Sequence, residues 1–535
     1  MTKKSKKILR STEFKIFLTA WIVYAFYLQM YGSSCMANSQ SALTAAIVNE
    51  GRLQIDTYQK VSCDISFYNG HYYSGQPPGI SFISAPLYIA AKPAFSLIPD
   101  STIDSLYQKL ENYGDKLPPD YWGNKKTISS YFSSLSKRQI LEYLFISGFI
   151  LPLFTTALIS ALSVAVFYMF IKNFTKKEYL RLLSTALYAF GTIGFHLSTL
   201  FFERPIAIAV FFMAFFIIFR IRHGQLNPNL TMLFLTGLLA GSSAAFDYFH
   251  ALALPLLAVY LALFFTEYKK SKDGGIKKLF SIRISKPNIS LILAFAIGMS
   301  IPLLMLGWYH YATFDSPFAI SYSHRIVETS DAKISDIANA KLPAMSTIYY
   351  VLEFFLNSPI MILAILAPYA ALRRKDMFFY DFAFIGILIA ASFVFALALA
   401  LVYPTVAPQF NRHMTPIIPY CFLALPYLIP QKKNNKSRRM LRIIVAIGIL
   451  SIFFNWINTM YEDADNFDLR NKRADFLPYF FSHGPSSPFT SALSGIFRIN
   501  NLILNLAGLA ALVCILLFIW KRHWNLKYFM NTKKQ

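Results

Sequence analysis

Long apolar runs divided by short polar segments are the feature that most limits what this chain can fold into. A helix of roughly 17–25 apolar residues can cross a bilayer, because it bonds its own backbone N–H and C=O groups in a solvent that offers them no partners. Runs of about this length fall near residues 14–31, 141–170, 182–202, 205–221, 230–247, 249–266, 289–309, 359–372, 378–403, 414–430, 440–457 and 501–520. The run at 359–372 is short, and it can begin earlier, within 345–358.

The charge content supports the same conclusion. Only 15% of the 535 residues are charged, against about 25% in a soluble protein. The sequence therefore predicts an all-α, polytopic integral membrane protein rather than a soluble one, with residues 1–535 forming a single transmembrane domain.

The distribution of basic residues predicts how these helices cross the membrane. The amino terminus is basic, with Lys3, Lys4, Lys6, Lys7 and Arg10. If it lies in the cytoplasm and the spans alternate, the connections that fall inside are basic and those outside carry the acids, as the positive-inside rule requires. This predicts about twelve spans with both termini cytoplasmic. It also accounts for the net charge of +24, which on a soluble domain would indicate nucleic acid binding.

Three segments are predicted to lie outside the spans, namely a first outer loop at 33–140, a last outer loop at 458–500 and a basic cytoplasmic tail at 521–535. The first outer loop is far longer than a connection needs to be. Its residues 37–54 have helical spacing, with Gly51 as the stop. The apolar run at 79–99 is broken by Pro86 and Pro93, so we expect an interfacial or re-entrant element, followed by interfacial helices.

Two of the four cysteines share this first outer loop. Cys35 and Cys63 can form a disulfide in an oxidising compartment, although sequence spacing alone does not establish the geometry that a disulfide requires. Cys421 and Cys514 lie within apolar runs, where cysteine acts as a small apolar side chain.

A polar segment at residues 63–88, set between apolar stretches, carries side chains suited to a polar substrate. It contains Asp64, His71, several tyrosines and a Gln-Pro-Pro-Gly turn. Other ionisable residues interrupt the apolar runs near the same outer boundary, and they are Glu203, Arg204, Asp247, His250, His310, His324, Arg325, Arg412 and His413. Such groups cost roughly 2.5–3.5 kcal/mol each at membrane depth, so they usually face a cavity or one another. Their position on one side predicts a functional site at the outer face.

The order of these motifs resembles the GT-C superfamily of membrane glycosyltransferases, in the family 39-like branch near the protein mannosyltransferases and aminoarabinose transferases. The motifs are ALTAAIVNEGRLQID, D-x-x-x-Y-N-G-H-Y-Y-S-x-x-P-P-G and N-R-H-M-x-P-I-I-P. The resemblance is clearest over residues 1–90 and 410–420. It implies transfer of a sugar from a polyprenyl- or dolichyl-phosphate donor to a lipid, glycan or protein acceptor, on the non-cytoplasmic face of the cell membrane.

The resemblance places the family's catalytic acid in the first outer loop, which implicates Asp64, with Asp56 second. Inverting transfer needs a carboxylate that takes the acceptor's proton and a group that stabilises the leaving phosphate. Asp64 is the candidate general base. Its structural alternative is a turn acid that caps Ile65 or Ser66.

Arginines suit the phosphate of such a donor, because a guanidinium forms paired hydrogen bonds. Arg412 and Arg204 are the candidates, although Arg204 can instead pair with Glu203 or extend to the headgroups. The remaining candidate substrate contacts are Asp56, His71, Tyr72, Tyr73, Asp247, Arg325 and His413. For the tyrosines the alternative is an interfacial aromatic belt, and for a lone histidine it is a satisfied polar group.

Two departures from the family pattern bear on activity. Close relatives often read Y-S-D-K-x-P-G, whereas Gly75 and Gln76 occupy the two charged positions here. Better-known members also carry an acid soon after the first span, where this chain has Asn38 and Gln40. Changes at these positions would alter the donor or acceptor, or abolish activity.

No cofactor is expected to be obligatory. A divalent cation beside Asp64 and Asp247 is compatible with their chemistry, but metal-ligand spacing is absent from the sequence, and the arginines can neutralise the phosphate. Walker and dinucleotide-binding motifs are also absent. Two alternatives stay open, a lipid or solute transporter or flippase, and a non-catalytic membrane subunit. A transporter would favour internal repeats and charges near mid-membrane.

Overall fold

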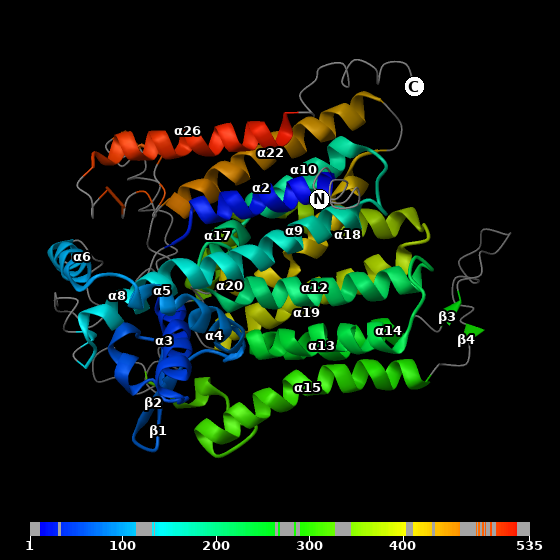
Figure 1. Ribbon diagram of the computed structural model, residues 1–535. Coiled ribbons are helices and arrows are strands. Elements are labelled where there is room, and N and C mark those ends of the chain that lie inside the picture. Colours follow the sequence, from blue (N-terminus) through cyan, green and yellow to red (C-terminus); the bar gives the residue numbers. More distant parts are fainter. Residues whose placement is uncertain are drawn as a thin grey trace, which may run out of the picture.

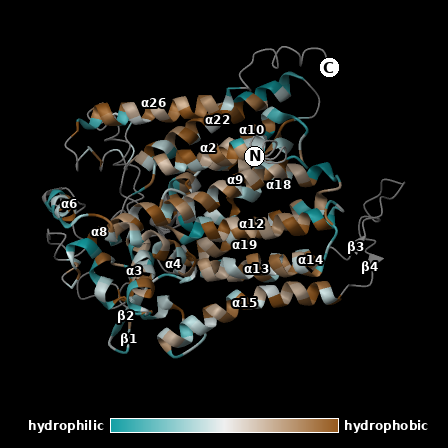
Figure 2. Cartoon of the chain, viewed as in Figure 1, coloured by the Kyte–Doolittle hydropathy of each residue, from teal (hydrophilic) through white to brown (hydrophobic). Residues whose placement is uncertain are grey.

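The computed structural model of the protein describes residues 11–29, 34–113, 131–132, 134–262, 266–267, 283–284, 289–326, 344–402, 410–430, 434–460 and 499–521, and isolated positions between 478 and 494. Its long helices lie side by side in a bundle (Figure 1). Apolar residues dominate the middle of the bundle and polar residues gather toward its two ends (Figure 2). In the described residues, six helices are long and apolar enough to cross a membrane, or up to eight if each of two bent pairs is one span.

The six long helical segments are α8 to α9 (Lys137–Ile171), α12 (Glu203–Arg222), α15 (Ile289–Phe314), α19 (Phe379–Val402), α22 (Asn435–Met460) and α26 (Asn501–Trp520). The bent pairs join α4 (Gly79–Ala91) and α5 (Pro93–Ser96) to α6 (Asp100–Tyr113) at 112°, and α17 (Ala344–Asn357) to α18 (Ile360–Arg374) at 98°. Shorter helices are α2 (Thr12–Phe26), α3 (Cys35–Glu50), α10 (Glu178–Phe190), α11 (Gly194–Leu197), α13 (Leu230–Phe246), η5 (Tyr248–Ala253), α14 (Leu254–Ala262), α20 (Phe410–His413) and α21 (Ile418–Ala424).

Every apolar run of the sequence contains helix, in agreement with a multi-pass, helical membrane protein. Several of these helices are nevertheless shorter than a span requires. The run at 182–202 is interrupted after Phe190, where Gly191 ends α10 and only the short α11 follows. The run at 414–430 begins and ends in 3₁₀ turns that contain prolines. Twelve spans and their orientation therefore remain predictions. The predicted tail at 521–535 and most of the last outer loop at 458–500 lie outside the described residues.

The segment predicted to be the first outer loop is described at residues 34–113, 131–132 and 134–140, and residues 114–130 of that prediction lie outside the described residues. Helix α3 is buried along most of its length and ends at Gly51, whose φ of +65° is the left-handed conformation that favours glycine. A disulfide joins Cys35, the first residue of α3, to Cys63, with their Cα atoms 5.3 Å apart. The apolar run at 79–99 forms α4 and α5 and then turns sharply into α6, in keeping with an interfacial or re-entrant element.

The polar segment adds a small sheet to the expected all-α architecture. Strands β1 (Ile65–Tyr68) and β2 (His71–Ser74) form an antiparallel hairpin in which Ser66 pairs with Tyr73. The turn residues Asn69 and Gly70 both have positive φ, which is the requirement of a tight type I′ turn. Strand β5 (Arg325–Ile326) pairs with the other edge of β1.

The bundle has two distinct ends. In Figure 1 the hairpin, α3 and α6 lie at one end, and the short strands β3 (Thr266–Glu267) and β4 (Arg283–Ile284) lie at the other. Helix α15 runs between them, because β4 precedes its start and its last residue, Phe314, contacts Tyr68 of the hairpin at 6.0 Å between ring centroids. The segment that joins α15 to β5, residues 315–324, therefore lies at the hairpin end.

Close packing of α13 against α15 provides a test of the fold. A Cβ on Gly298 would overlap the backbone carbonyl of Phe234, so Gly298→Ala should lower the free energy of unfolding by about 1–3 kcal/mol. Gly386→Ala on α19 is the matched control, since a Cβ there meets nothing within 4 Å. It should leave stability unchanged or slightly raised. Thermal unfolding in detergent measures both, and equal melting temperatures would contradict the close approach of α13 and α15.

Candidate functional site

Asp64 is buried at the base of the hairpin, directly after the disulfide and before β1. Its side chain is 1% exposed, and Nη2 of Arg325 lies 2.5 Å from Oδ1. The Gln76 side-chain amide donates a hydrogen bond to Oδ2. Register explains the ion pair, because Arg325 in β5 stands opposite Ser66, two residues beyond Asp64. The carboxylate thus contacts a guanidinium and an amide, rather than capping Ile65 or Ser66.

Tyr322 completes this group, which we call the acid cluster (Asp64, Gln76, Tyr322 and Arg325). The Tyr322 hydroxyl donates to Oε1 of Gln76 at 3.3 Å, and the Arg325 guanidinium lies 5.9 Å from the centre of the Tyr322 ring. Burial raises the pKa of the Tyr322 phenol well above its ordinary value, so the hydroxyl stays protonated and acts as a donor.

A second group of charges lies where α12 and η5 begin, and we call it the ion-pair cluster (Glu203, Arg204, Asp247 and His250). Nε of Arg204 lies 3.8 Å from Oδ2 of Asp247 and 4.0 Å from Oε1 of Glu203. Nδ1 of His250 lies 3.4 Å from the same Asp247 oxygen. These separations exceed a good hydrogen bond, and Nε and Nη1 of Arg204 have no hydrogen-bond partner among the described residues. All four side chains are nonetheless buried.

Helix α3 connects the two clusters. Oγ of Ser39 accepts a hydrogen bond from the backbone N–H of Gly75 at 3.1 Å, beside the acid cluster. The next residue, Gln40, donates to the Glu203 carboxylate in the ion-pair cluster. One turn of a single helix therefore fixes both clusters at the hairpin end of the bundle.

A cavity of about 260 Å³ opens beside the ion-pair cluster. Its lining is mostly apolar and comes from α12, η5 to α14, α19 and α20 to α21. It consists of Ile208, Phe211, Asp247, Phe249, His250, Leu252, Ala253, Leu256, Leu388, Ala391, Ser392, Phe395, Arg412, His413, Pro416 and Tyr420. Leu252 and Ala391 are exposed on the surface of the bundle. The cavity is therefore accessible from the apolar side of the helices, between η5 and α19.

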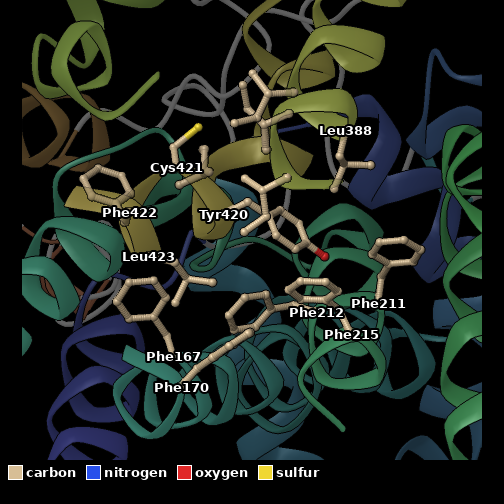
Figure 3. Close-up of a cluster of buried hydrophobic side chains, with 14 of the residues drawn as sticks. Phe167, Phe170, Phe211, Phe212, Phe215, Leu388, Tyr420, Cys421, Phe422 and Leu423 are labelled. Carbon is tan, nitrogen blue, oxygen red and sulfur yellow. The ribbon is translucent and has the colours of Figure 1, made fainter. Parts of the chain in front are cut away.

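The polar groups of this cavity are incompletely satisfied. His413 is 8% exposed, and neither of its ring nitrogens has a hydrogen-bond partner among the described residues. Its ring contacts Phe249 edge-on at 4.8 Å. The Tyr420 hydroxyl also lacks a partner within that part of the chain, and Figure 3 shows the Tyr420 ring among Phe211, Phe212 and Phe215. Buried polar atoms are rarely left without partners, so these atoms indicate a place for a polar ligand group.

Arg412 brings a guanidinium to the cavity. It is 4% exposed, its Nη1 lies 3.1 Å from the sulfur of Met36 in α3, and its guanidinium lies 5.9 Å from the ring centre of Phe202. Arg412 and His413 are adjacent in α20, and α3 belongs to the hairpin end. Arg412 and His413 therefore lie at the same end of the bundle as Asp64.

The sequence-predicted residues fall into three places. Asp247, Arg412 and His413 line the cavity, with Arg204 paired to Asp247, while Asp64 and Arg325 form the acid cluster. The other four, Asp56, His71, Tyr72 and Tyr73, are not among the cavity-lining residues.

These four residues stabilise the hairpin. Oδ2 of Asp56 lies 2.8 Å from Nδ1 of His71, and Oδ1 accepts from the backbone N–H of Tyr72 at 2.7 Å. The Tyr73 ring is buried against Phe314, with 5.4 Å between ring centroids, and its burial raises the pKa of the Tyr73 phenol.

Sequence reasoning missed Gln76 and Tyr322 as members of the site. Gln76 was noted only as a departure from a family motif, yet its amide holds Asp64. Tyr322 gives no signal in the sequence, because its role depends on a contact with a segment 246 positions away. The Asn-Gly dipeptide at residues 69–70 is a signal that could have indicated the hairpin next to Gln76, but the prediction of an all-α fold did not use it.

Within the described residues, no three His, Cys, Asp or Glu side chains are grouped so that they could hold a metal ion. The expectation that no metal is obligatory remains a prediction. Comparison of the sequence with known protein families gives no match, and comparison with curated proteins gives none either.

Proposed function

We propose that the chain is a membrane glycosyltransferase of the GT-C type, which transfers a sugar from a polyprenyl- or dolichyl-phosphate donor to a lipid, glycan or protein acceptor. The observation that carries this proposal is the cavity. Its walls are apolar and accessible from the side of the helix bundle, while Arg412 and His413 supply polar groups at the end that also holds Asp64. An amphipathic carrier with a long apolar chain and one anionic headgroup fits this combination.

The phosphate of such a donor would contact Arg412 and His413. Arginine binds phosphate oxygens with charge-assisted hydrogen bonds, and His413 has nitrogens that no described residue engages. Arg204 lies behind them, with its charge only loosely matched by Asp247. As the sugar–phosphate bond breaks, its electron pair passes to the phosphate, and nearby cations stabilise that developing charge.

Asp64 would act as the general base. In the inverting reaction the acceptor's oxygen attacks the anomeric carbon, and its proton passes to a carboxylate. Asp64 adjoins the ion-pair cluster through Ser39 and Gln40 of α3. Better-known family members carry an acid soon after the first span, where this chain has Gln40. The Gln40 side chain contacts the carboxylate of Glu203, so α12 supplies an acid beside that position.

Binding of the donor tests the cavity. Ala391→Trp should fill it and weaken binding of farnesyl phosphate at least about tenfold, which is about 1.4 kcal/mol. Ala390→Trp is the matched control, because Ala390 is exposed on the same helix but does not line the cavity. Calorimetry or fluorescence titration of the purified protein measures both. Equal affinities for the two variants would reject the cavity as the carrier site.

Transfer of sugar tests the base. Asp64→Asn should reduce transfer from a prenyl-phosphate sugar by about 10²–10⁴-fold, while donor binding is retained, because an amide cannot accept the proton. Asp104→Asn is the control, since Asp104 is 53% exposed and only pairs with Lys137. Unchanged transfer by Asp64→Asn would remove Asp64 from the mechanism. Carrier binding without transfer by the unmutated protein, across several sugars, would favour a flippase.

Orientation is part of the same proposal, with about twelve spans, both termini in the cytoplasm and the hairpin end outside. The Cys35–Cys63 disulfide supports it, because disulfides persist in oxidising compartments. In a chain without Cys421 and Cys514, His71→Cys should react with an impermeant maleimide in intact cells, because His71 is 52% exposed at the hairpin. Lys177→Cys, between α9 and α10, should react only after permeabilisation. The reverse pattern would overturn the orientation.

A further inference from the structure

We propose that Arg325 is a positioning residue for Asp64, and that residues 315–326, here called the latch, hold it over the carboxylate. The inference deepens the proposed function, on which its mechanistic meaning rests. The latch can be tested independently of that function, because it either covers Asp64 or does not. The chain supplies the cation that faces its candidate base from a segment more than two hundred residues away, rather than from the hairpin itself.

The contacts of Asp64 show why one cation matters. Its side chain is 1% exposed, and a buried carboxylate without a counter-charge is strongly destabilising. Gln76 offers a neutral amide, and Oγ of Ser62 accepts from the backbone N–H of Asp64, not from its side chain. Among the described residues, Arg325 is the one cation in ion-pair contact with this carboxylate.

Gly75 makes this arrangement sterically specific. A Cβ on Gly75 would overlap Oδ1 of Asp64, the oxygen that faces Arg325. Both residues of the first departure, Gly75 and Gln76, therefore bear on Asp64. Gly75 leaves room for the carboxylate, and Gln76 holds it without charge, which leaves the charge to Arg325.

The latch is fixed to the hairpin by polar contacts. Oγ of Ser321 donates to the carbonyl of Gly75 at 3.0 Å, and Oγ of Ser66 donates to the carbonyl of Ser321 at 2.8 Å. At its other end the Asp315 carboxylate accepts from the Tyr68 hydroxyl at 3.1 Å. The strand that carries Arg325 pairs over only two residues. Such a segment can open locally at a small cost compared with a helix of the bundle.

The latch also reaches the cavity. The Tyr322 ring lies 5.4 Å from Tyr248 and 6.5 Å from Phe249, and Phe249 lines the cavity beside His413. Tyr322 also donates a hydrogen bond to Gln76, and its ring lies against the Arg325 guanidinium. A ligand that displaces Phe249 would therefore disturb the contacts that cover Asp64, which gives the acid a way to respond to the occupied cavity.

Chemical labelling of Asp64 tests the latch without any need for transfer activity. The full-length protein in detergent is treated with a water-soluble carbodiimide and glycine ethyl ester, and labelling of the peptide that contains Asp64 is followed by mass spectrometry. Arg325→Gln should label Asp64 at least about tenfold faster than the unmutated protein. Arg325→Lys should stay within about threefold of it, because the charge is kept. Labelling of Arg325→Gln no faster than the unmutated protein would overturn the proposal.

A second-site variant makes the test specific for charge. Gln76→Lys places an ammonium beside the Asp64 oxygen that the glutamine amide now contacts, so adding it to Arg325→Gln should slow labelling again. If Arg325→Gln does not fold, recovery of a folded protein by Gln76→Lys is the expected result. A double variant that labels as fast as Arg325→Gln, or fails to fold as it does, would reject the charge role of Arg325.

Lys137→Gln is the matched control for loss of a cation. Lys137 pairs with Asp104 at 2.6 Å on the exposed surface of the same end, so its removal should leave Asp64 labelling unchanged. Failure of the proposed function is distinguishable from failure of the latch. Absence of sugar transfer with labelling as expected would reject the enzyme assignment alone, whereas normal transfer by Arg325→Gln with unchanged labelling would reject the latch alone.

Discussion

Burial of charge is the constraint on which the rest of this structure depends. Asp64, Arg204, Asp247 and Arg412 are each less than 5% exposed, and a buried ion costs several kcal/mol unless a partner offsets it. The hairpin, α3 and the start of α12 are placed so that Asp64 meets Arg325 and Arg204 lies near Asp247. These contacts give the hairpin end of the apolar helix bundle a defined arrangement of polar side chains.

The opposite end of the bundle shows what a purely structural charge cluster looks like. Asp381 of α19 accepts from Nη1 of Arg222 at 3.0 Å and from the Tyr260 hydroxyl at 2.5 Å, and Nε2 of His223 lies 3.0 Å from its other oxygen. Every oxygen is engaged at hydrogen-bond distance, and three helices are joined. Arg204 and His413 contrast with this, because their buried nitrogens are left without hydrogen bonds in the described part of the chain. Incomplete satisfaction of buried polar groups, rather than the presence of charge, distinguishes the candidate site from a structural clasp.

Local patterns in the sequence were sufficient for the helices and for parts of the site. Apolar periodicity located the runs, Gly51 marked the end of α3, and ionisable residues that interrupt apolar runs indicated the polar end. Span number did not follow as directly, because glycines and prolines shorten helices within apolar runs. The contacts of Asp64 with Arg325 and Gln76 were beyond such patterns. They depend on strand register between segments far apart in the chain, and a single sequence carries no signal for that pairing.

The departures at Gly75 and Gln76 acquire a different meaning from the structure. Taken as a loss of two charged residues, they argue for an inactive relative of an enzyme family. In the structure, Gly75 and Gln76 lie directly against Asp64, and Arg325 supplies a positive charge at the carboxylate. A side chain at position 75 would push against the oxygen that Arg325 contacts, so the glycine and the arginine are two parts of one arrangement. Because Arg325 comes from a distant segment, the environment of Asp64 depends on residues 315–326, which also contact the cavity through Tyr322 and Phe249.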